Sequence, residues 1–294
     1  MHKIIKSRTS IILISLILSY FITEVYQNIL GFILILSVGL IHGANDLLII
    51  KNFSIKESNN SQISYFFYYL SIVFLGLIFF YILPSVALLT FVIVSIYHFG
   101  EQHWEVTLDN NSISRFKKIF LMTFHGLIFF IIIFMNNIIS VNEVLNSFNL
   151  PPLYYSYLII TLSSSLIIYV LFLIYLNELR EYFINEITFL ILFFLLTINS
   201  TLIYGFAIYF IFFHSLLSIK DQVKFIYGND KSESIKKYIT SSLPYFILAL
   251  TSLLIFYLVV DLQEINLLPI IFTFLAAITF PHVIVIEKMY RYKK

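Results

Sequence analysis

Long apolar segments, separated by short polar turns, run through almost the whole chain of 294 residues. A helix needs about 20 apolar residues to cross the hydrocarbon core of a membrane. Hydrophobic residues make up 60% of the chain and charged residues only 12%, which is too little polar surface for a soluble protein. The pattern predicts an all-α polytopic membrane helix bundle, with about ten transmembrane helices in one integral membrane domain over residues 1–294. The predicted spans cover roughly 9–25, 29–50, 63–83, 85–107, 119–137, 153–176, 186–198, 201–219, 239–260 and 267–287.

The positions of the basic residues provide a check on this count. Cytoplasmic loops of membrane proteins carry an excess of Lys and Arg. When the N-terminus is placed in the cytoplasm and the chain alternates through ten helices, all 18 Lys and Arg residues fall on the cytoplasmic side. We therefore expect a multi-pass protein of the plasma (inner) membrane with both termini cytoplasmic. No small-residue cleavage site follows the first span, so we expect that span to be a retained helix.

The chain contains no cysteine. This excludes disulfides, thiolate nucleophiles, iron–sulfur clusters and cysteine-ligated zinc. The apolar composition also excludes disordered and nucleic-acid-binding proteins. A bound metal must therefore be held by histidine, carboxylate or other oxygen ligands.

Four histidines lie at similar distances from the cytoplasmic ends of their predicted spans. His42 lies nine residues before the next basic residue, His214 and His282 each lie six before one, and His98 lies eleven before a polar turn. At a rise of about 1.5 Å per residue, these four side chains share one layer of the bundle. Imidazoles from several helices at one depth are typical of a metal site inside a helix bundle. An all-imidazole site favours iron, with zinc or copper as alternatives.

Two carboxylates accompany these histidines. Asp46 follows His42 by four residues, and Glu101 follows His98 by three. The i,i+4 spacing usually aims a carboxylate at an imidazole on a neighbouring helix, where it orients a metal ligand by binding its distal N–H. We assign Asp46 and Glu101 such supporting roles in the binding of the cofactor.

Small residues and a proline flank the same histidines. Gly43 and Ala44 are expected to let another helix approach closely. Pro281, directly before His282, is expected to kink the last span. Simpler explanations remain for each residue: a membrane histidine often makes only an interhelical hydrogen bond, and His103 and His125, near the same layer, fit interfacial anchors.

The segments around these histidines resemble the Brp/Blh family of membrane β-carotene 15,15′-dioxygenases. The similar segments are His42-Gly43-Ala44-Asn45-Asp46, Tyr97-His98-Phe99-Gly100-Glu101, Phe213-His214-Ser215-Leu216-Leu217-Ser218 and Phe280-Pro281-His282.

The resemblance implies an Fe(2+) enzyme that cleaves β-carotene with O2 at its central double bond and yields two retinals. It further implies that the enzyme acts among membrane lipids and that its retinal supplies a retinal-binding rhodopsin. By position, His42, His98 and His214 match family histidines expected to bind iron. Many members carry a further histidine at the place of Ser218, so His282, or water and substrate, would fill the fourth position here.

Two other classes fit parts of the sequence. A different histidine-ligated iron oxygenase or hydroxylase acting on a carotenoid or lipid would need denser histidine clusters, of which the His98 to His103 spacing is the nearest approach. A non-enzymatic transporter with structural histidines would favour broken helices near the membrane midplane and inverted repeats. The sequence indicates neither feature.

Overall fold

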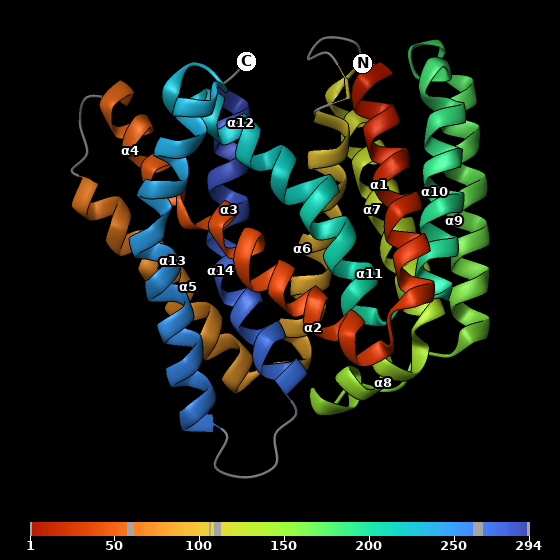
Figure 1. Cartoon of the computed structure of the whole chain (residues 1–294), viewed down its shortest axis with the longest axis horizontal. Coiled ribbons are helices and arrows are strands. Elements are labelled where there is room, and N and C mark those ends of the chain that lie inside the picture. The colour runs from red at the N-terminus through yellow and green to blue at the C-terminus, as the bar shows by residue number, and fades with distance from the viewer. Residues whose placement is uncertain (1, 58–61, 106, 109–112, 261–266, 293–294) are drawn as a thin grey trace. The chain divides into compact units, whose positions relative to one another are not determined.

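The computed structural model describes residues 2–57, 62–105, 107–108, 113–260 and 267–292. These residues form helices joined by short turns, with no strand among them (Figure 1). The predicted all-α architecture is confirmed.

The helices in chain order are α1 (His2–Phe21), α2 (Glu24–Leu34), η1 (Ile35–Gly39), α3 (Leu40–Ala44), α4 (Asp46–Glu57), α5 (Gln62–Ile82), α6 (Pro84–Glu105), α7 (Arg115–Asn136), α8 (Ile138–Ser147), α9 (Tyr155–Tyr175), η2 (Asn177–Tyr182), α10 (Phe183–Ile198), α11 (Leu202–Tyr209), η3 (Phe210–Ser215), α12 (Leu216–Tyr227), α13 (Ser232–Val260) and α14 (Leu267–Tyr292).

Within the described residues, nine helical segments are long and apolar enough to cross a membrane. The first predicted span corresponds to α1, whose apolar part, Thr9–Phe21, is shorter than the other segments. Large apolar side chains such as Phe21 and Tyr81 are exposed to 81% and 89%, as lipid contact requires. The chain is therefore a multi-pass membrane protein by length and composition of its helices, while the cytoplasmic location of its termini stays a prediction. A reporter fused at Asn146 should be external and a C-terminal reporter internal.

The chain folds into two compact units, each built from segments distant in sequence. Unit 1 contains Met1–Ile35, Ser95–Asn146 and Pro151–Leu217, and unit 2 contains Leu36–Val94, Ser147–Leu150 and Ser218–Lys294. The prediction of a single integral membrane domain stays a prediction.

Unit 1 has a core rich in aromatic and branched side chains. Within it α7 packs along α9, α2 along α11, and α1 along α10 (Figure 1). A Cβ atom on Gly31 of α2 would lie 2.8 Å from the Ile203 side chain of α11, so glycine permits this close approach. The Tyr204 hydroxyl donates a hydrogen bond to the Ser15 carbonyl of α1 at 3.2 Å. The first span is therefore an integral part of this core.

Unit 2 is organised by the pairing of α14 with α5 and of α13 with α3. A Cβ on Gly76 of α5 would lie 3.3 Å from the Ala277 Cα of α14. A second core cluster lies where α4 meets α14, with Ile49, Phe53 and Met289 among its buried members.

Two predicted spans are not regular α-helices. The span over 29–50 contains the π-helical segment η1 and a break at Asn45, and the span over 201–219 contains the π-helical segment η3. At the break, the Asn45 side-chain amide donates to the Tyr238 carbonyl at 2.9 Å. A π turn holds an extra residue compared with an α turn, and such turns occur frequently at functional sites.

Candidate metal centre

Unit 2 brings His42 of α3 next to His282 of α14. Their ring centroids lie 4.5 Å apart and their planes meet at 78°. Both side chains are buried, with 5% and 3% exposure. Gly43 lies beside this pair, but a Cβ there would only reach ordinary contact, at 3.9 Å from His282 Nδ1. Gly43 therefore faces α14 at ordinary contact distance, and the expectation that Gly43 and Ala44 let another helix approach closely stays a prediction.

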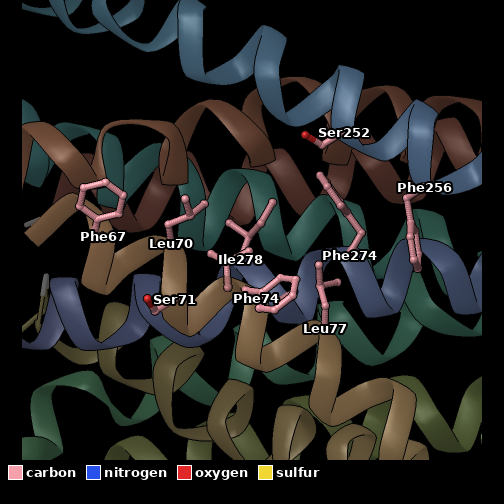
Figure 2. A pocket seen from close by; sticks show the side chains of 11 residues that line it. Phe67, Leu70, Ser71, Phe74, Leu77, Ser252, Phe256, Phe274 and Ile278 are labelled. Atoms are coloured by element: carbon pink, nitrogen blue, oxygen red, sulfur yellow. The ribbon is translucent and has the colours of Figure 1, made fainter.

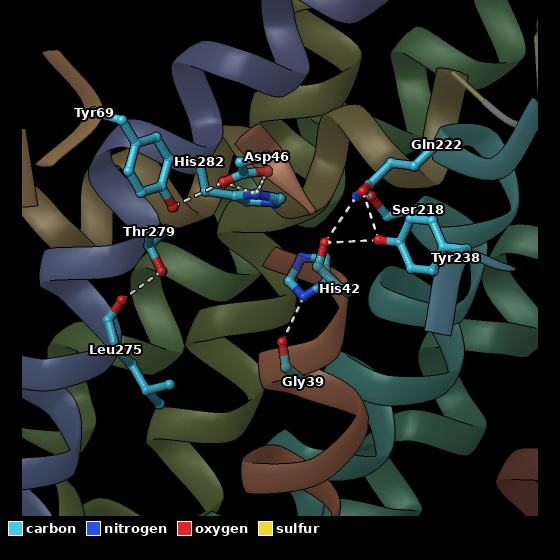
Figure 3. A network of polar contacts seen from close by, with 10 residues as sticks. All are labelled: Gly39, His42, Asp46, Tyr69, Ser218, Gln222, Tyr238, Leu275, Thr279 and His282. Carbon is cyan, nitrogen blue, oxygen red and sulfur yellow. Dashed lines mark hydrogen bonds and ion pairs between the residues drawn. The ribbon is translucent and has the colours of Figure 1, made fainter. Parts of the chain in front are cut away.

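The main chain and two polar side chains hold His42. Its Nδ1–H donates to the Gly39 carbonyl at 2.7 Å, which leaves Nε2 as the nitrogen that a metal would bind. The His42 carbonyl accepts from Gln222 Nε2 at 3.0 Å and lies 3.2 Å from the Tyr238 hydroxyl. Figure 3 shows these side chains converging on His42. The position of this imidazole is therefore fixed from two sides.

A carboxylate holds His282. His282 Nδ1 lies 2.8 Å and 3.0 Å from the two oxygens of Asp46, whose side chain is 1% exposed. The Tyr69 hydroxyl donates to Asp46 Oδ2 at 3.0 Å (Figure 3). Asp46 thus contacts the imidazole of α14 rather than that of His42, four residues before it. A carboxylate on Nδ1 directs Nε2 toward a metal and raises the basicity of the imidazole.

Ser218 belongs to the same polar network. It is completely buried, and its hydroxyl accepts a hydrogen bond from Gln222 Nε2 at 3.0 Å. Gln222 in turn accepts from Tyr238 at 2.7 Å. Ser218 therefore supports Gln222, which binds the His42 carbonyl. The sequence did not identify Gln222, Tyr238 or Tyr69, since no spacing pattern links them to the histidines.

Unit 1 brings His98 of α6 next to His214 of η3. The ring centroids lie 4.6 Å apart at an interplanar angle of 72°, and both side chains are almost fully buried. Glu101 Oε2 lies 3.6 Å from His98 Nδ1. The Phe99 ring meets the His214 ring edge-on at 4.6 Å. Each unit therefore contains a buried pair of imidazoles that meet edge to face, with a carboxylate beside one member.

The donor set of these pairs fits a transition metal. Within each pair, the histidines offer ring nitrogens that lie within 4.8 Å of one another. Metal-binding histidines usually bind a carboxylate or a carbonyl through the other nitrogen, as His282 does with Asp46 and His42 does with Gly39. The buried histidines are thus able to hold a metal ion.

His103 and His125 are not interfacial anchors, because their side chains are buried, with 1% and 0% exposure. Both contact Glu186 of α10, which lies only 6% exposed in the apolar core. No spacing pattern in the sequence links Glu186 to these histidines, although an acidic residue at the start of an apolar span was a usable signal.

An apolar cleft of about 500 Å³ lies in unit 2 between α5, α13 and α14. Figure 2 shows Phe67, Phe74 and Phe256 among the side chains that line it. Ile278 of α14 also lines the cleft, four residues before His282 and so on the same face of the helix. A volume of this size and an aromatic lining are typical of sites for small apolar ligands.

Comparison with family sequence models gives a match over most of the chain. The sequence model of the family described as beta-carotene 15,15'-dioxygenase matches residues 33–290, which is most of the chain and includes the four paired histidines. No curated protein and no solved structure matches the chain. The resemblance seen in the histidine segments is confirmed at the level of the family, and the chain belongs to the beta-carotene 15,15'-dioxygenase family.

Proposed function

We propose that the protein uses iron(II) to cleave β-carotene with O2 at its central 15,15′ double bond. The C=C bond breaks, each carbon receives one oxygen atom of O2, and two retinal molecules form. The family match over residues 33–290 is the observation that carries this proposal. The buried, oriented imidazoles in both units support it, because the reaction needs a metal.

We propose that His42, His98, His214 and His282 together bind the iron. The sequence places all four at a similar depth in the predicted membrane spans, which supports this assignment. The similar edge-to-face pairing of buried imidazoles in each unit supports it as well. When bound, iron(II) supplies the activation of O2 that carotenoid cleavage requires. The buried surroundings keep water away from the reaction.

The protein's own polar groups orient these ligands. Asp46 binds Nδ1 of His282 and the Gly39 carbonyl binds Nδ1 of His42, so each ring is held in the tautomer that presents Nε2. Glu101, beside His98, has the same supporting role in our proposal. The reaction itself needs no general acid or base from the chain.

The apolar cleft of unit 2 supports a polyene substrate. Its lining is aromatic and aliphatic except for Ser71 and Ser252. β-Carotene is a hydrocarbon without polar groups, so its binding depends on apolar contact area rather than on hydrogen bonds. Ile278 lies one helical turn from His282, so an end of the polyene in the cleft would place the rest of the chain near the imidazoles.

Two alternatives have some support. A histidine-ligated iron oxygenase acting on another carotenoid or lipid would use the same imidazoles. A transporter gains limited support from the break at Asn45 in the span over 29–50, because transporters use interrupted helices, whereas η1 and η3 are continuous π-helix. The family match favours the dioxygenase over both. We further propose that the protein works in the plasma (inner) membrane, among lipids, and that its retinal supplies a rhodopsin.

Expression in bacteria that accumulate β-carotene tests the activity. We expect loss of colour and formation of retinal, with one oxygen atom from labelled O2 in each product after rapid reduction to retinol. His98→Ala should form no retinal, and Glu178→Gln, a change at an exposed carboxylate, should behave as wild type. Products of unequal length would contradict central cleavage, and unchanged β-carotene with iron-loaded wild-type protein would contradict the dioxygenase.

A further inference from the structure

A second group of metal-binding side chains lies in unit 1, made of His103 on α6, His125 on α7 and Glu186 on α10. His103 Nε2 lies 3.0 Å from Glu186 Oε2, and His125 Nδ1 lies 2.6 Å from Glu186 Oε1. Each residue offers one ligand atom, and these three atoms lie within 4.8 Å of one another. We refer to these three residues as the His-His-Glu triad.

Glycines on α6 and α7 bring the two histidines together. A Cβ on Gly100 would lie 1.7 Å from the Met122 carbonyl oxygen, and a Cβ on Gly126 would lie 1.8 Å from the Ile96 carbonyl oxygen. The two backbones therefore touch at a distance that only glycine permits. Gly100 lies three residues before His103 and Gly126 directly follows His125, so this contact fixes the spacing of the two imidazoles.

The two imidazoles are stacked rather than crossed. Their ring centroids lie 3.8 Å apart at an angle of 22°, and the Phe189 ring of α10 packs within 5.5 Å of one and 5.8 Å of the other. Each imidazole directs one ring nitrogen toward Glu186, Nε2 of His103 and Nδ1 of His125. Ligands on one ion at metal–ligand distances of about 2.0–2.2 Å are separated by about 3 Å when neighbouring ligands meet near a right angle. The separations of 2.6 Å from His125 to Glu186 Oε1 and 3.0 Å from His103 to Glu186 Oε2 are near this value, and they are also hydrogen-bond distances.

Two tyrosine hydroxyls lie within hydrogen-bond distance of residues of the triad. The Tyr209 hydroxyl lies 3.1 Å from Nε2 of His125, which leaves Nδ1 for the side facing Glu186. The Tyr169 hydroxyl donates to Glu186 Oε1 at 3.1 Å. Hydrogen bonds of this kind orient metal ligands in known sites.

A small polar cavity adjoins the triad. Its volume is about 30 Å³, and Thr107, Tyr182, Asn185, His103 and Glu186 are among its lining residues. This is enough space for one water molecule with several hydrogen-bond partners. Two imidazoles, one carboxylate and an adjacent open position are the donor set of the facial triad that binds divalent iron, and they also suit zinc.

We propose that His103, His125 and Glu186 bind a second divalent transition-metal ion, such as iron(II) or zinc(II), independently of the four histidines of the proposed iron site. The competing explanation is a metal-free network in which the two imidazoles and Tyr169 donate to the Glu186 carboxylate. In that network one imidazole must be protonated to offset the buried negative charge, because an uncompensated charge is costly in an apolar core. A bound cation offsets the charge while both imidazoles stay neutral.

Metal analysis of full-length protein, purified in detergent, tests the proposal. Wild-type protein should contain two metal ions per chain. Glu186→Gln, which keeps the size of the side chain and removes its charge, should contain one, as should His103→Ala. The ion retained at the other site shows that these variants are folded. Glu178→Gln is the matched control, because Glu178 is an exposed carboxylate just before α10, and it should retain both ions.

Cobalt(II) added to metal-depleted protein gives a second measurement that does not depend on activity. The absorption bands of the ion in the triad should be absent in Glu186→Gln, and Tyr209→Phe should weaken this binding by about tenfold, as for other partners that orient a metal ligand. Equal metal content in wild type and Glu186→Gln would overturn the proposal in favour of the metal-free network. Loss of both ions in Glu186→Gln would overturn the independence of the site.

The proposed function can fail separately. If His98→Ala retains all of its metal while Glu186→Gln loses one ion, the triad binds metal and the four-histidine assignment is wrong.

Discussion

The imidazole pair of unit 2 and the His-His-Glu triad of unit 1 use a buried carboxylate in different ways. Asp46 lies behind His282, on Nδ1, and receives a second hydrogen bond from Tyr69. Glu186 lies between two imidazoles and contacts one with each of its oxygens. In our proposal the carboxylate orients a ligand in the first region and is itself a ligand in the second. The comparison teaches that the position of a carboxylate relative to the imidazoles, and not only its presence beside a histidine, is what a role must be argued from.

The largest effect should distinguish the two regions directly. His98→Ala removes an imidazole from the proposed iron site, so retinal formation should fall by more than about 100-fold, beyond what loss of an orienting partner causes. Metal in the triad should remain, since His98 is not one of its ligands. Retinal yield and metal content per chain are the measurements. Full activity in this variant would contradict the proposed iron site.

The role of Asp46 can be tested through His282. Asp46→Asn keeps the size of the side chain but removes the charge that holds Nδ1 of His282, so iron affinity should fall by about 10–100-fold. His282→Ala should lower it further, because a ligand is lost. Tyr69→Phe, which removes only a hydrogen bond to Asp46, should have a smaller effect. Iron titration of depleted protein gives the order, and an order with Tyr69→Phe first would contradict the role of Asp46.

Two glycine variants test how closely the helices pack at the histidines, without changing any proposed metal ligand. Gly100→Ala places a methyl group against the Met122 carbonyl, so it should destabilise the protein by at least about 1–3 kcal/mol and separate His103 from His125. Gly43→Ala meets only ordinary contacts and should change stability by about 0.5 kcal/mol or less. Thermal unfolding in detergent measures both. Equal stability of the two variants would refute the close contact of α6 with α7.

The smallest effect is expected at Ser218. Ser218→Ala removes one of the two groups that accept from the Gln222 amide, a change of about 1 kcal/mol. The contact of Gln222 with the His42 carbonyl remains, so iron content and retinal yield should stay near wild type. A complete loss of iron in Ser218→Ala would show that the serine, and not His282, has the fourth position.

The sequence predicted the features that depend on composition along the chain. Apolar runs and histidine positions identified the spans and the paired residues, because hydropathy and residue counts are local quantities. The partners were harder to find. His282 lies 236 residues after Asp46, and Glu186 lies 83 residues after His103. No period or spacing in one sequence connects residues across such distances.

The helix interruptions were also beyond the sequence. Ile35–Gly39 and Phe210–Ser215 are as apolar as their surroundings, and hydropathy carries no information about which backbone carbonyl an amide will bind. The places of closest helix contact were also beyond the sequence. Small size permits a close approach but does not require one: a Cβ on Gly43 would meet only ordinary contacts, and among the described glycines the closest approaches occur at Gly100 and Gly126.

The π-helical segment η3 determines how the chain would respond to a change in the number of residues. His214 lies within Phe210–Ser215. Deleting one residue from a regular α-helix turns the residues beyond the deletion by about 100° relative to those before it. A π turn holds one residue more than an α turn, so deleting one residue from this segment before His214 would let a regular α-helix form with little rotation of His214 relative to α11. A single-codon deletion should therefore displace this imidazole less here than the same deletion would in a regular α-helix.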